Sequence, residues 1–210
     1  MRITEIFHSI QGESSHAGRP CAFVRLTGCN LRCRWCDSEY TFTGGEKMSI
    51  DDVVARVKSY GCKLVEVTGG EPLAQSESFD LIKQLCDEEF EVLIETSGSI
   101  DITPVDRRAK IILDIKCPGS GEVEKNRWSN LDDLRDHDEI KFVIADRADY
   151  EWAKRVIAEK QLEGRTILFS PVWGELELKP LAEWMLADRV PARLQTQLHK
   201  HIWGADVHGV

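Results

Sequence analysis

Short apolar runs rich in β-branched residues alternate with amphipathic segments along most of the chain, and such runs predict strands. The predicted strands are Cys21–Thr27, Leu64–Thr68, Val92–Thr96, Ile111–Ile115, Ile140–Ala145, Thr166–Ser170 and Arg193–His199. Apolar residues three and four positions apart predict helices between them, at Ser49–Tyr60, Ser76–Glu89, Ala148–Gln161 and Leu178–Ala187. Strands that alternate with helices are typical of a parallel sheet.

A succession of about six strand and helix steps predicts one α/β domain, a partial or complete barrel of the (β/α)6 type. No internal repeat, low-complexity tract or Pro/Gly/Ser-rich linker marks a domain boundary. In such barrels the site lies where the strands end, at their carboxyl edge. Segments with polar residues or glycine follow or end five of the predicted strands, at Gly28, Gly69–Glu71, Glu95–Thr96, Asp114–Lys116 and Ser170–Pro171. We therefore expect one site at this edge.

Composition limits the class of partner. Of the 210 residues 42% are hydrophobic, which is enough for a closed core. The 27 basic and 36 acidic residues give a net charge of −9, a field that repels phosphate backbones, so we do not expect nucleic acid as a partner. No run approaches the ~20 apolar residues of a membrane span, and the N-terminus lacks the order of charges and apolar residues of a signal peptide. We expect a cytoplasmic protein without a membrane partner.

Three of the seven cysteines, Cys29, Cys33 and Cys36, fall in one C-x3-C-x2-C stretch, and the other four are scattered. Three thiolates on one loop suit a four-iron four-sulfur (4Fe-4S) cluster with one iron left open to another ligand. The alternative is zinc, with a residue such as His16 or Cys21 as the fourth ligand. No second pair of cysteines accompanies the loop, which favours the iron–sulfur interpretation.

A second feature is the strand Leu64–Thr68, which runs into Gly69, Gly70, Glu71 and Pro72. Residues without a Cβ allow a ligand to approach the backbone closely, although an ordinary glycine turn has the same sequence.

With Trp35 just before its last cysteine, the cysteine loop resembles that of the radical S-adenosylmethionine (SAM) enzymes, and the Gly-Gly-Glu segment resembles their SAM-binding segment. In that superfamily the amino and carboxylate groups of SAM chelate the open iron. An electron from the cluster then cleaves the sulfonium, which yields methionine and a 5′-deoxyadenosyl radical. The resemblance implies that the protein positions these groups and excludes water and oxygen.

Further segments resemble the 7-carboxy-7-deazaguanine synthase family over nearly the whole chain. They are EIFHSIQGE, GRPCAFVRLTGCNLRCRWCDS, TGGEP, ETSGS, DIKCPGSG and QLHK. The resemblance implies a lyase of queuosine biosynthesis that converts 6-carboxy-5,6,7,8-tetrahydropterin to 7-carboxy-7-deazaguanine with loss of ammonia and regenerates SAM. It also implies Mg²⁺, a homodimer, and a flavodoxin- or ferredoxin-like electron donor. Residues 1–210 then form one radical SAM core with an N-terminal substrate-binding segment and a short C-terminal extension.

The resemblance implies roles for individual residues. Cys29, Cys33 and Cys36 hold the cluster and, with Glu95, are the expected catalytic residues. The expected substrate-binding residues are Ile10, Gln11, Gly12, Arg25, Thr68 and Glu95. The expected SAM-binding residues are Trp35, Cys36, Asp37, Gly70, Asp114, Ile115, Lys116, Ser170, Pro171, Val172 and Trp173. Ser38 is the expected Mg²⁺ ligand, where the family commonly has threonine.

Residue chemistry supports two of these roles, although an arginine on a strand is more commonly a surface ion-pair residue. Arg25, between Val24 and Leu26, suits a bidentate contact with the carboxylate of the pterin. Glu95 ends an apolar strand, where a carboxylate needs a donor such as the guanidine-like edge of the pterin. His199 and Lys200 are candidates for closing the pocket, and no role is assigned to the residues after Lys200, which lack the terminal proline of some family members.

Two other functions remain open at this point. One is an activating protein for a glycyl-radical enzyme, which shares the cysteine loop and the glycine segment. The other is a non-catalytic zinc-binding module.

Overall fold

The computed structural model describes residues 1–210 and contains one nine-stranded sheet, in the order β3-β1-β2-β4-β5-β6-β7-β8-β9. The strands are β1 (Arg2–Ile10), β2 (Pro20–Leu26), β3 (Glu46–Lys47), β4 (Leu64–Gly69), β5 (Glu91–Thr96), β6 (Lys110–Ile115), β7 (Glu139–Ile144), β8 (Thr166–Pro171) and β9 (Arg193–Leu194). The α-helices are α1 (Ile50–Lys58), α2 (Glu77–Asp87), α3 (Asn130–Asp133), α4 (Arg147–Glu159), α5 (Leu178–Asp188) and α6 (Leu198–Trp203). Short 3-10 turns are η1 (Glu39–Thr41), η2 (Pro72–Ala74), η3 (Pro118–Ser120) and η4 (Val123–Lys125).

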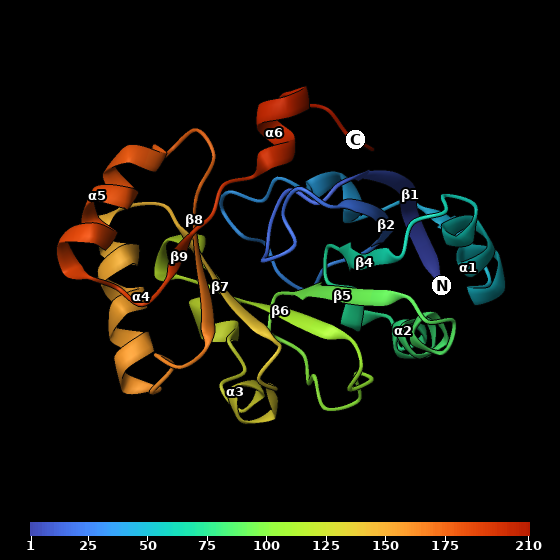
Figure 1. Ribbon diagram of the computed structural model, residues 1–210, viewed down its shortest axis with the longest axis horizontal. Helices are drawn as coiled ribbons and strands as arrows, with labels where there is room; N and C mark the ends of the chain where they lie inside the picture. The colour runs from blue at the N-terminus through green and yellow to red at the C-terminus, as the bar shows by residue number, and fades with distance from the viewer.

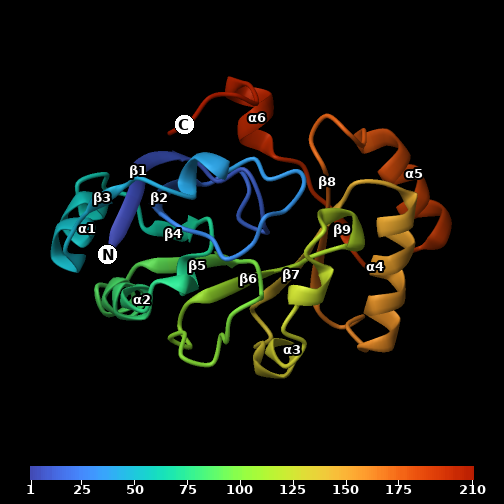
Figure 2. The same ribbon diagram turned by 180° about the vertical axis from the view of Figure 1, so that it is seen from behind.

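Strands β2 and β4 to β9 are parallel and curve into an open, partial barrel, whereas β1 and β3 add antiparallel strands at one edge (Figure 1). Helices α1 and α2 cover one end of the sheet and α4 and α5 the other, as the reverse view also shows (Figure 2). This arrangement confirms the predicted α/β fold with a partial barrel. No helix is long and apolar enough to cross a membrane.

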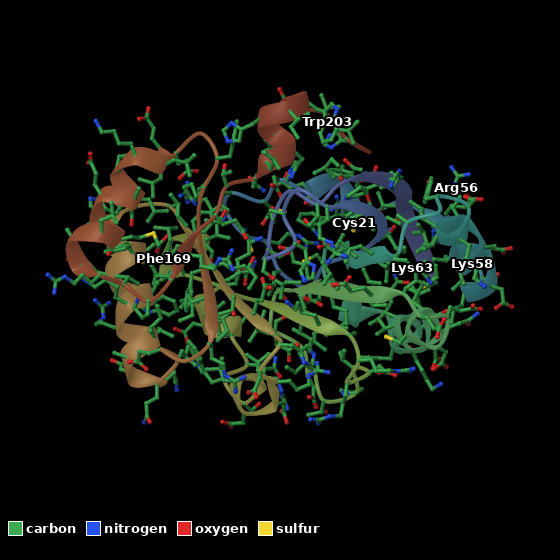
Figure 3. All side chains as sticks on the ribbon, viewed as in Figure 1. Cys21, Arg56, Lys58, Lys63, Phe169 and Trp203 are labelled. Atoms are coloured by element: carbon green, nitrogen blue, oxygen red, sulfur yellow. The ribbon has the colours of Figure 1, made fainter.

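Helices α1 and α4 begin after a capping side chain, Ser49 for α1 and Asp146 for α4. The hydroxyl of Ser49 accepts a hydrogen bond from the backbone N–H of Asp52 at 3.1 Å, and Val53, Val54 and Val57 of α1 are buried against the sheet. These helices and the outer face of the sheet enclose the main core of 37 buried residues. Figure 3 shows one member, Phe169 of β8, between the sheet and the outer helices.

A second apolar cluster, Cys21, Phe23, Leu64, Leu93 and Ile112, fills the inside of the barrel near the amino ends of the strands. Side chains two positions apart on a strand point to the same face. Two positions further along the strands, this face carries Arg25, Glu66, Glu95 and Asp114, all of which line a cavity. The barrel interior therefore changes from apolar to charged toward its carboxyl edge.

The structure differs from the sequence expectations in the number of strand and helix steps and in the extent of one predicted strand. The connection between β5 and β6, residues 97–109, contains no helix, so one strand and helix step is missing. The predicted strand Arg193–His199 was wrong in extent: β9 pairs with β8 only through Arg193 and Leu194. The chain then crosses the barrel mouth and forms α6, which carries the partly exposed Trp203 (Figure 3).

Candidate active site

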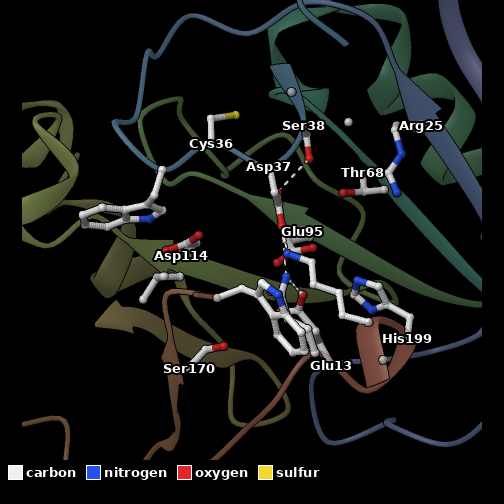
Figure 4. Close-up of a pocket in the computed structure, with 18 of the residues that line it drawn as sticks. Glu13, Arg25, Cys36, Asp37, Ser38, Thr68, Glu95, Asp114, Ser170 and His199 are labelled. Carbon is white, nitrogen blue, oxygen red and sulfur yellow. Dashed lines mark hydrogen bonds and ion pairs between the residues drawn. The ribbon is translucent and has the colours of Figure 1, made fainter. Parts of the chain in front are cut away.

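A cavity of about 620 Å³ opens at the carboxyl edge of the parallel strands. It is lined by all the residues that the sequence nominated for cluster, SAM, metal or substrate, with the exception of Ile115. The side chain of Ile115 is 3% exposed and packs in the main core, so only its backbone remains for a ligand contact. Figure 4 shows Cys36, Arg25, Asp114 and Ser170 around this cavity. Residues from distant parts of the chain thus meet at the predicted edge.

The three cysteines lie on the loop after β2, half-buried and free. Burial raises the pKa of all three thiols, that of Cys33 to about 11. Ligation requires thiolates, so binding of a cluster releases protons. Three thiols on one short loop fit a larger cluster.

The glycine segment after β4 supports the cysteine loop directly. A Cβ at Gly70 would lie 2.4 Å from the carbonyl oxygen of Gly28 and 2.6 Å from the Cβ of Cys29. The backbone N–H of Glu71 donates to that same carbonyl oxygen at 2.9 Å. The two segments therefore meet through their backbones, which only glycine at position 70 allows.

Glu71 itself is fully buried and does not line the cavity. Its carboxylate accepts hydrogen bonds from the backbone N–H of Leu73 at 3.0 Å, the hydroxyl of Thr96 at 2.9 Å and the backbone N–H of Ser97 at 2.7 Å. It fixes the end of β5 beside the glycine segment, which is a structural role.

Asp114 and Lys116 at the end of β6 form an ion pair of 2.7 Å. Burial opposes the charged form of Lys116, but Asp114 raises its pKa well above the ordinary value. The other carboxylate oxygen of Asp114, Oδ1, is buried and has no partner within the protein. A buried oxygen of this kind fits a ligand that brings a hydroxyl or amino donor, as SAM does.

Arg25 projects into the cavity from β2, beside Thr68 in the register of β2 with β4. Its only side-chain hydrogen bond runs from Nε to Glu5 at 2.7 Å, and the hydroxyl of Tyr40 donates to the same oxygen at 2.9 Å. The two terminal nitrogens of the guanidinium carry no hydrogen bond within the protein. They remain available for a bidentate contact with an anion.

Three charged side chains form a network across the cavity. The ammonium of Lys141 on β7 donates to Glu13 at 2.6 Å and also to Glu95 on β5. Burial opposes its charged form, but the two carboxylates raise the pKa of Lys141 well above its ordinary value. Burial raises the pKa of Glu95, with Lys141 opposing this shift. The carboxylate of Glu95 is therefore already engaged by a cation.

Glu66 on β4 is 5% exposed and accepts a hydrogen bond from the side-chain amide of Gln11. Burial and the nearby charges of Glu95 and Glu13 raise its pKa to about 8. It makes no ion pair.

The sequence interpretation overlooked Glu13, Glu66 and Lys141 as site residues. A signal for the last two is present, because each is a charge with apolar neighbours inside a strand: Glu66 lies between Val65 and Val67, and Lys141 lies between Ile140 and Phe142. The same signal identified Arg25 and Glu95. Glu13 lies in a loop without such a pattern.

Residues 195–200, the C-terminal strap, lie over the cavity mouth. The amide of Gln197 donates to Glu13 at 3.0 Å and to Asp37 at 3.1 Å, and the ammonium of Lys200 donates to Asp37 at 2.7 Å. His199 packs on Gly12, where a Cβ would lie 2.2 Å from its Nδ1 atom. The strap therefore ties the N-terminal segment to the cysteine loop, and both His199 and Lys200 line the cavity. Figure 4 shows His199 beside Glu13.

The residues after the strap also reach the cavity, although the sequence interpretation assigned them no role. Residues 205–210 line it, and the ring of His208 lies 4.3 Å from the ring of Tyr40, centroid to centroid. The chain terminus thus returns to the side of the cavity that holds Arg25.

Comparison with known proteins supports the same interpretation. The family model of the Radical SAM superfamily matches residues 23–119. The 7-carboxy-7-deazaguanine synthase of Chlorobaculum tepidum is 50% identical over 214 residues, covering 100% of this chain and 97% of that protein. The corresponding protein of Koribacter versatilis is 47% identical, with 100% of both covered. The crystal structure of QueE from Escherichia coli matches with a TM-score of 0.77 and 25% identity, covering 94% of both chains. Streptococcus suis SuiB, at 13% identity and a TM-score of 0.57, shares the fold over 83% of this chain and 47% of its own.

Proposed function

The chain belongs to the 7-carboxy-7-deazaguanine synthase family, and from that premise we propose how its residues carry the reaction. The protein is a radical SAM lyase of queuosine biosynthesis, with a 4Fe-4S cluster and SAM as cofactors. It converts 6-carboxy-5,6,7,8-tetrahydropterin to 7-carboxy-7-deazaguanine and ammonia. The single observation that carries the assignment of residues is that one cavity collects the cysteine loop, the glycine segment and Arg25.

The cofactor side of the cavity is formed by Cys29, Cys33 and Cys36, the proposed cluster ligands. When bound, cluster and SAM supply the one-electron chemistry that activates a C–H bond of the substrate. The unpartnered oxygen of Asp114, together with Lys116, Gly70 and the β8 end from Ser170 to Trp173, supports a SAM site beside the loop. Trp35 and Asp37 complete it.

The substrate side is formed by Arg25, Thr68 and the segment from Ile10 to Gly12. The free terminal nitrogens of Arg25 hold the carboxylate of the pterin in a bidentate contact. The strap and the ion pair of Lys200 with Asp37 exclude water over the bound substrate. Loss of ammonia requires a proton on the departing nitrogen. We propose that the hydrogen-bonded pair of Lys141 and Glu95 supplies that proton, which passes from the ammonium of Lys141 through the carboxylate of Glu95.

Magnesium fits the oxygen donors beside Cys36. Ser38 retains a hydroxyl, which donates to Asp37 at 3.0 Å, and both side chains line the cavity. Mg²⁺ takes oxygen ligands and is usually bound by one or two protein groups together with substrate and water. We propose Ser38 as its protein ligand.

The remaining proposals concern partners and location. Arg32 and Arg34 are exposed on either side of Cys33, which suits the docking of an acidic flavodoxin- or ferredoxin-like electron donor. A homodimer follows from the family resemblance alone. All seven cysteines are free, which supports a reducing, cytoplasmic location.

The test is turnover under anaerobic conditions. Reconstituted and reduced protein is given SAM, Mg²⁺ and the carboxytetrahydropterin, and the product and ammonia are measured. We expect both in equal amounts, without stoichiometric loss of SAM, and a fall in rate when Mg²⁺ is removed. Intact cluster without deazaguanine product would defeat the proposal. Activation of a protein partner instead would favour the glycyl-radical interpretation.

A further inference from the structure

We propose that Glu66, held by Gln11, is the specificity-determining residue that binds the amino-pyrimidinone edge of the pterin. This inference rests on the proposed function, and it moves that role from Glu95 to a residue that the sequence interpretation had not considered. Glu66 lines the cavity from the middle of β4.

Glu66 forms no ion pair, although the charge of Arg25 on β2 acts to lower its pKa. The other acids that line the cavity with an ion pair are Glu13 and Glu95 with Lys141, Asp114 with Lys116, Asp37 with Lys200, and Glu175 with Arg34. Glu66 makes one hydrogen bond, from the amide of Gln11 to its Oε2 atom. A buried carboxylate without a cation is costly, because the lost hydration is replaced by a single neutral donor. A ligand with N–H donors supplies what is missing.

The free oxygen of Glu66 is accessible from the cavity. Oε1 makes no hydrogen bond in the protein, and it is not among the fully enclosed polar atoms without a partner. The amide of Gln11 is fixed by its other end, because its Oε1 atom accepts the backbone N–H of Glu13 at 3.1 Å. Gln11 therefore presents its N–H group to Glu66 and cannot reverse without losing this bond. It orients the carboxylate toward the ligand.

The surroundings of Glu66 suit a flat ring. Phe23, its neighbour in the register of β2 with β4, stacks on Phe7 with the ring centroids 4.8 Å apart and the planes 9° apart, and both rings line the cavity. Arg25, two residues after Phe23 on the same face, provides the cationic group for a carboxylate. A ligand with a carboxylate at one end and a donor edge at the other matches these two groups.

The hydrogen-bond donors on the ring edge of the ligand indicate which ligand Glu66 binds. The 2-amino-4-oxopyrimidine ring of a pterin has a ring N–H next to its exocyclic amino group. Two adjacent N–H donors match one carboxylate in two parallel hydrogen bonds. Glu95 is less suited, because Lys141 already donates to its carboxylate. Burial and the nearby acids keep the pKa of free Glu66 at about 8, and a donor edge would restore its ordinary ionised form.

The experiment compares two stable ligands on the full-length, cluster-loaded protein by calorimetry. The probes are 6-carboxypterin and 6-carboxylumazine, in which an oxygen replaces the 2-amino group. We expect the wild type to prefer the pterin by about 100-fold, since a missing donor leaves Glu66 facing an oxygen. In Glu66→Gln the preference falls at least 10-fold, because the side-chain amide can donate a hydrogen bond to the 2-oxo group of the lumazine. The comparison variant Glu95→Gln keeps the wild-type preference. The second variant is Glu66→Asp, which retains the charge. Its preference for the pterin should stay within 10-fold of the wild-type preference.

The possible outcomes distinguish a failure of the proposed function from a failure of the role proposed for Glu66. A wild type that binds neither ligand contradicts the proposed function, because no pterin site is then present. A wild type that binds both equally overturns the role of Glu66, as does an unchanged preference in Glu66→Gln. Loss of the preference in Glu95→Gln alone would return the role to Glu95. A preference lost in Glu66→Gln and kept in Glu66→Asp supports the inference.

Discussion

Gly70 lies so close to the cysteine loop that a Cβ at this position would stand 2.6 Å from the Cβ of Cys29. It would also stand 2.4 Å from the carbonyl oxygen of Gly28, a distance that real Cβ contacts do not reach. Position 70 therefore sets how the cysteine loop rests on the end of β4, in addition to its proposed place beside SAM. The glycine segment and the cysteine loop act as one unit.

We predict that Gly70→Ala displaces the cysteine loop. A shift of about 1 Å at a reacting centre lowers rates by about 100-fold, and we expect at least this loss of turnover together with a lower iron content. Gly164→Ala is the matched control, because a Cβ there has nothing within 4 Å. Iron and sulfide analysis of both variants checks the prediction. Wild-type iron and turnover in Gly70→Ala would show that the loop is set by other contacts.

The cluster ligands are distinguished from the other cysteines by alanine substitution. Replacing any of Cys29, Cys33 or Cys36 should abolish the cluster absorbance and turnover, because each supplies a thiolate to an iron. Cys62→Ala is the control, since Cys62 is half-buried but does not line the cavity. One variant of the loop that retains full activity would make the ligand assignment wrong.

Arg25 is predicted to bind the substrate carboxylate through two nitrogens. In Arg25→Lys a single ammonium replaces the planar fork, and we expect the KM for the pterin to rise about 10-fold to 100-fold with cluster content unchanged. Arg19→Lys, at an exposed ion pair with Glu91, is the control for the same chemical change. Steady-state kinetics of the two variants measure the difference. An effect on kcat alone would argue against a binding role.

Glu66 and Glu95 should affect stability in opposite directions. Glu66→Gln removes a buried acid without a cation and should raise the melting temperature, whereas Glu95→Gln takes a carboxylate away from Lys141 and should lower it. We expect differences of roughly 5 °C for a chain of this size. Calorimetry of the cluster-loaded proteins provides the values. Equal shifts for both variants would contradict the charge distribution described for the cavity.

The difference in melting temperature between Glu66→Gln and the wild type should increase as the pH rises. Glu95 on β5, Glu13 after β1, Arg25 on β2 and the amide of Gln11 are the groups that face Glu66. The pKa of Glu66, about 8, lies above its ordinary value of 4.5. Its protonated form therefore contributes stability that is fully present below pH 4.5 and is lost as the pH rises through about 8. The amide has no such dependence. Melting temperatures between pH 6 and 8.5 check this, and a constant difference would show that Glu66 does not titrate there.

The C-terminal strap should pack over the cavity only when position 12 is glycine. Gly12→Ala places a Cβ 2.2 Å from Nδ1 of His199 and 3.0 Å from its backbone nitrogen, so the strap must move away. We expect the KM for the pterin to rise about 10-fold or more while the iron content stays at the wild-type level. Protection of the backbone amides of residues 197–200 from hydrogen exchange should fall in parallel. Unchanged protection would mean that the strap adapts to the added methyl group.

Much of the fold could be predicted because parallel strands are apolar and the helices have clear stripes. Strand β1 was missed, since a bulge between Ile3 and Glu5 shifts the register and interrupts the alternation of inward- and outward-facing residues along the strand. The predicted strand at 193–199 failed for another reason. The side chain of Gln195 donates to Glu13 at 3.0 Å and accepts the backbone N–H of Ser14 at 2.6 Å, so contacts across the molecule turn the chain away from β8.

The site could be predicted where chemistry and position coincide, as in the cysteine loop and Arg25. The partners of charged residues could not be predicted, because they depend on which strands become neighbours. Glu95 was expected to meet the ligand, but the pairing of the strands brings Lys141 to it from β7. The tail from 205 to 210 carries no chemical pattern at all, and only the path of the folded chain brings it to the cavity.

The central claim is that one iron of a cluster held by Cys29, Cys33 and Cys36 is open to SAM. Electron paramagnetic resonance of the reduced, reconstituted protein tests it directly, with SAM that carries ¹⁵N at its amino group and ¹⁷O at its carboxylate. The account predicts hyperfine coupling of both labels to the cluster when SAM is added. A spectrum that SAM leaves unchanged, in protein with a complete cluster, would contradict it.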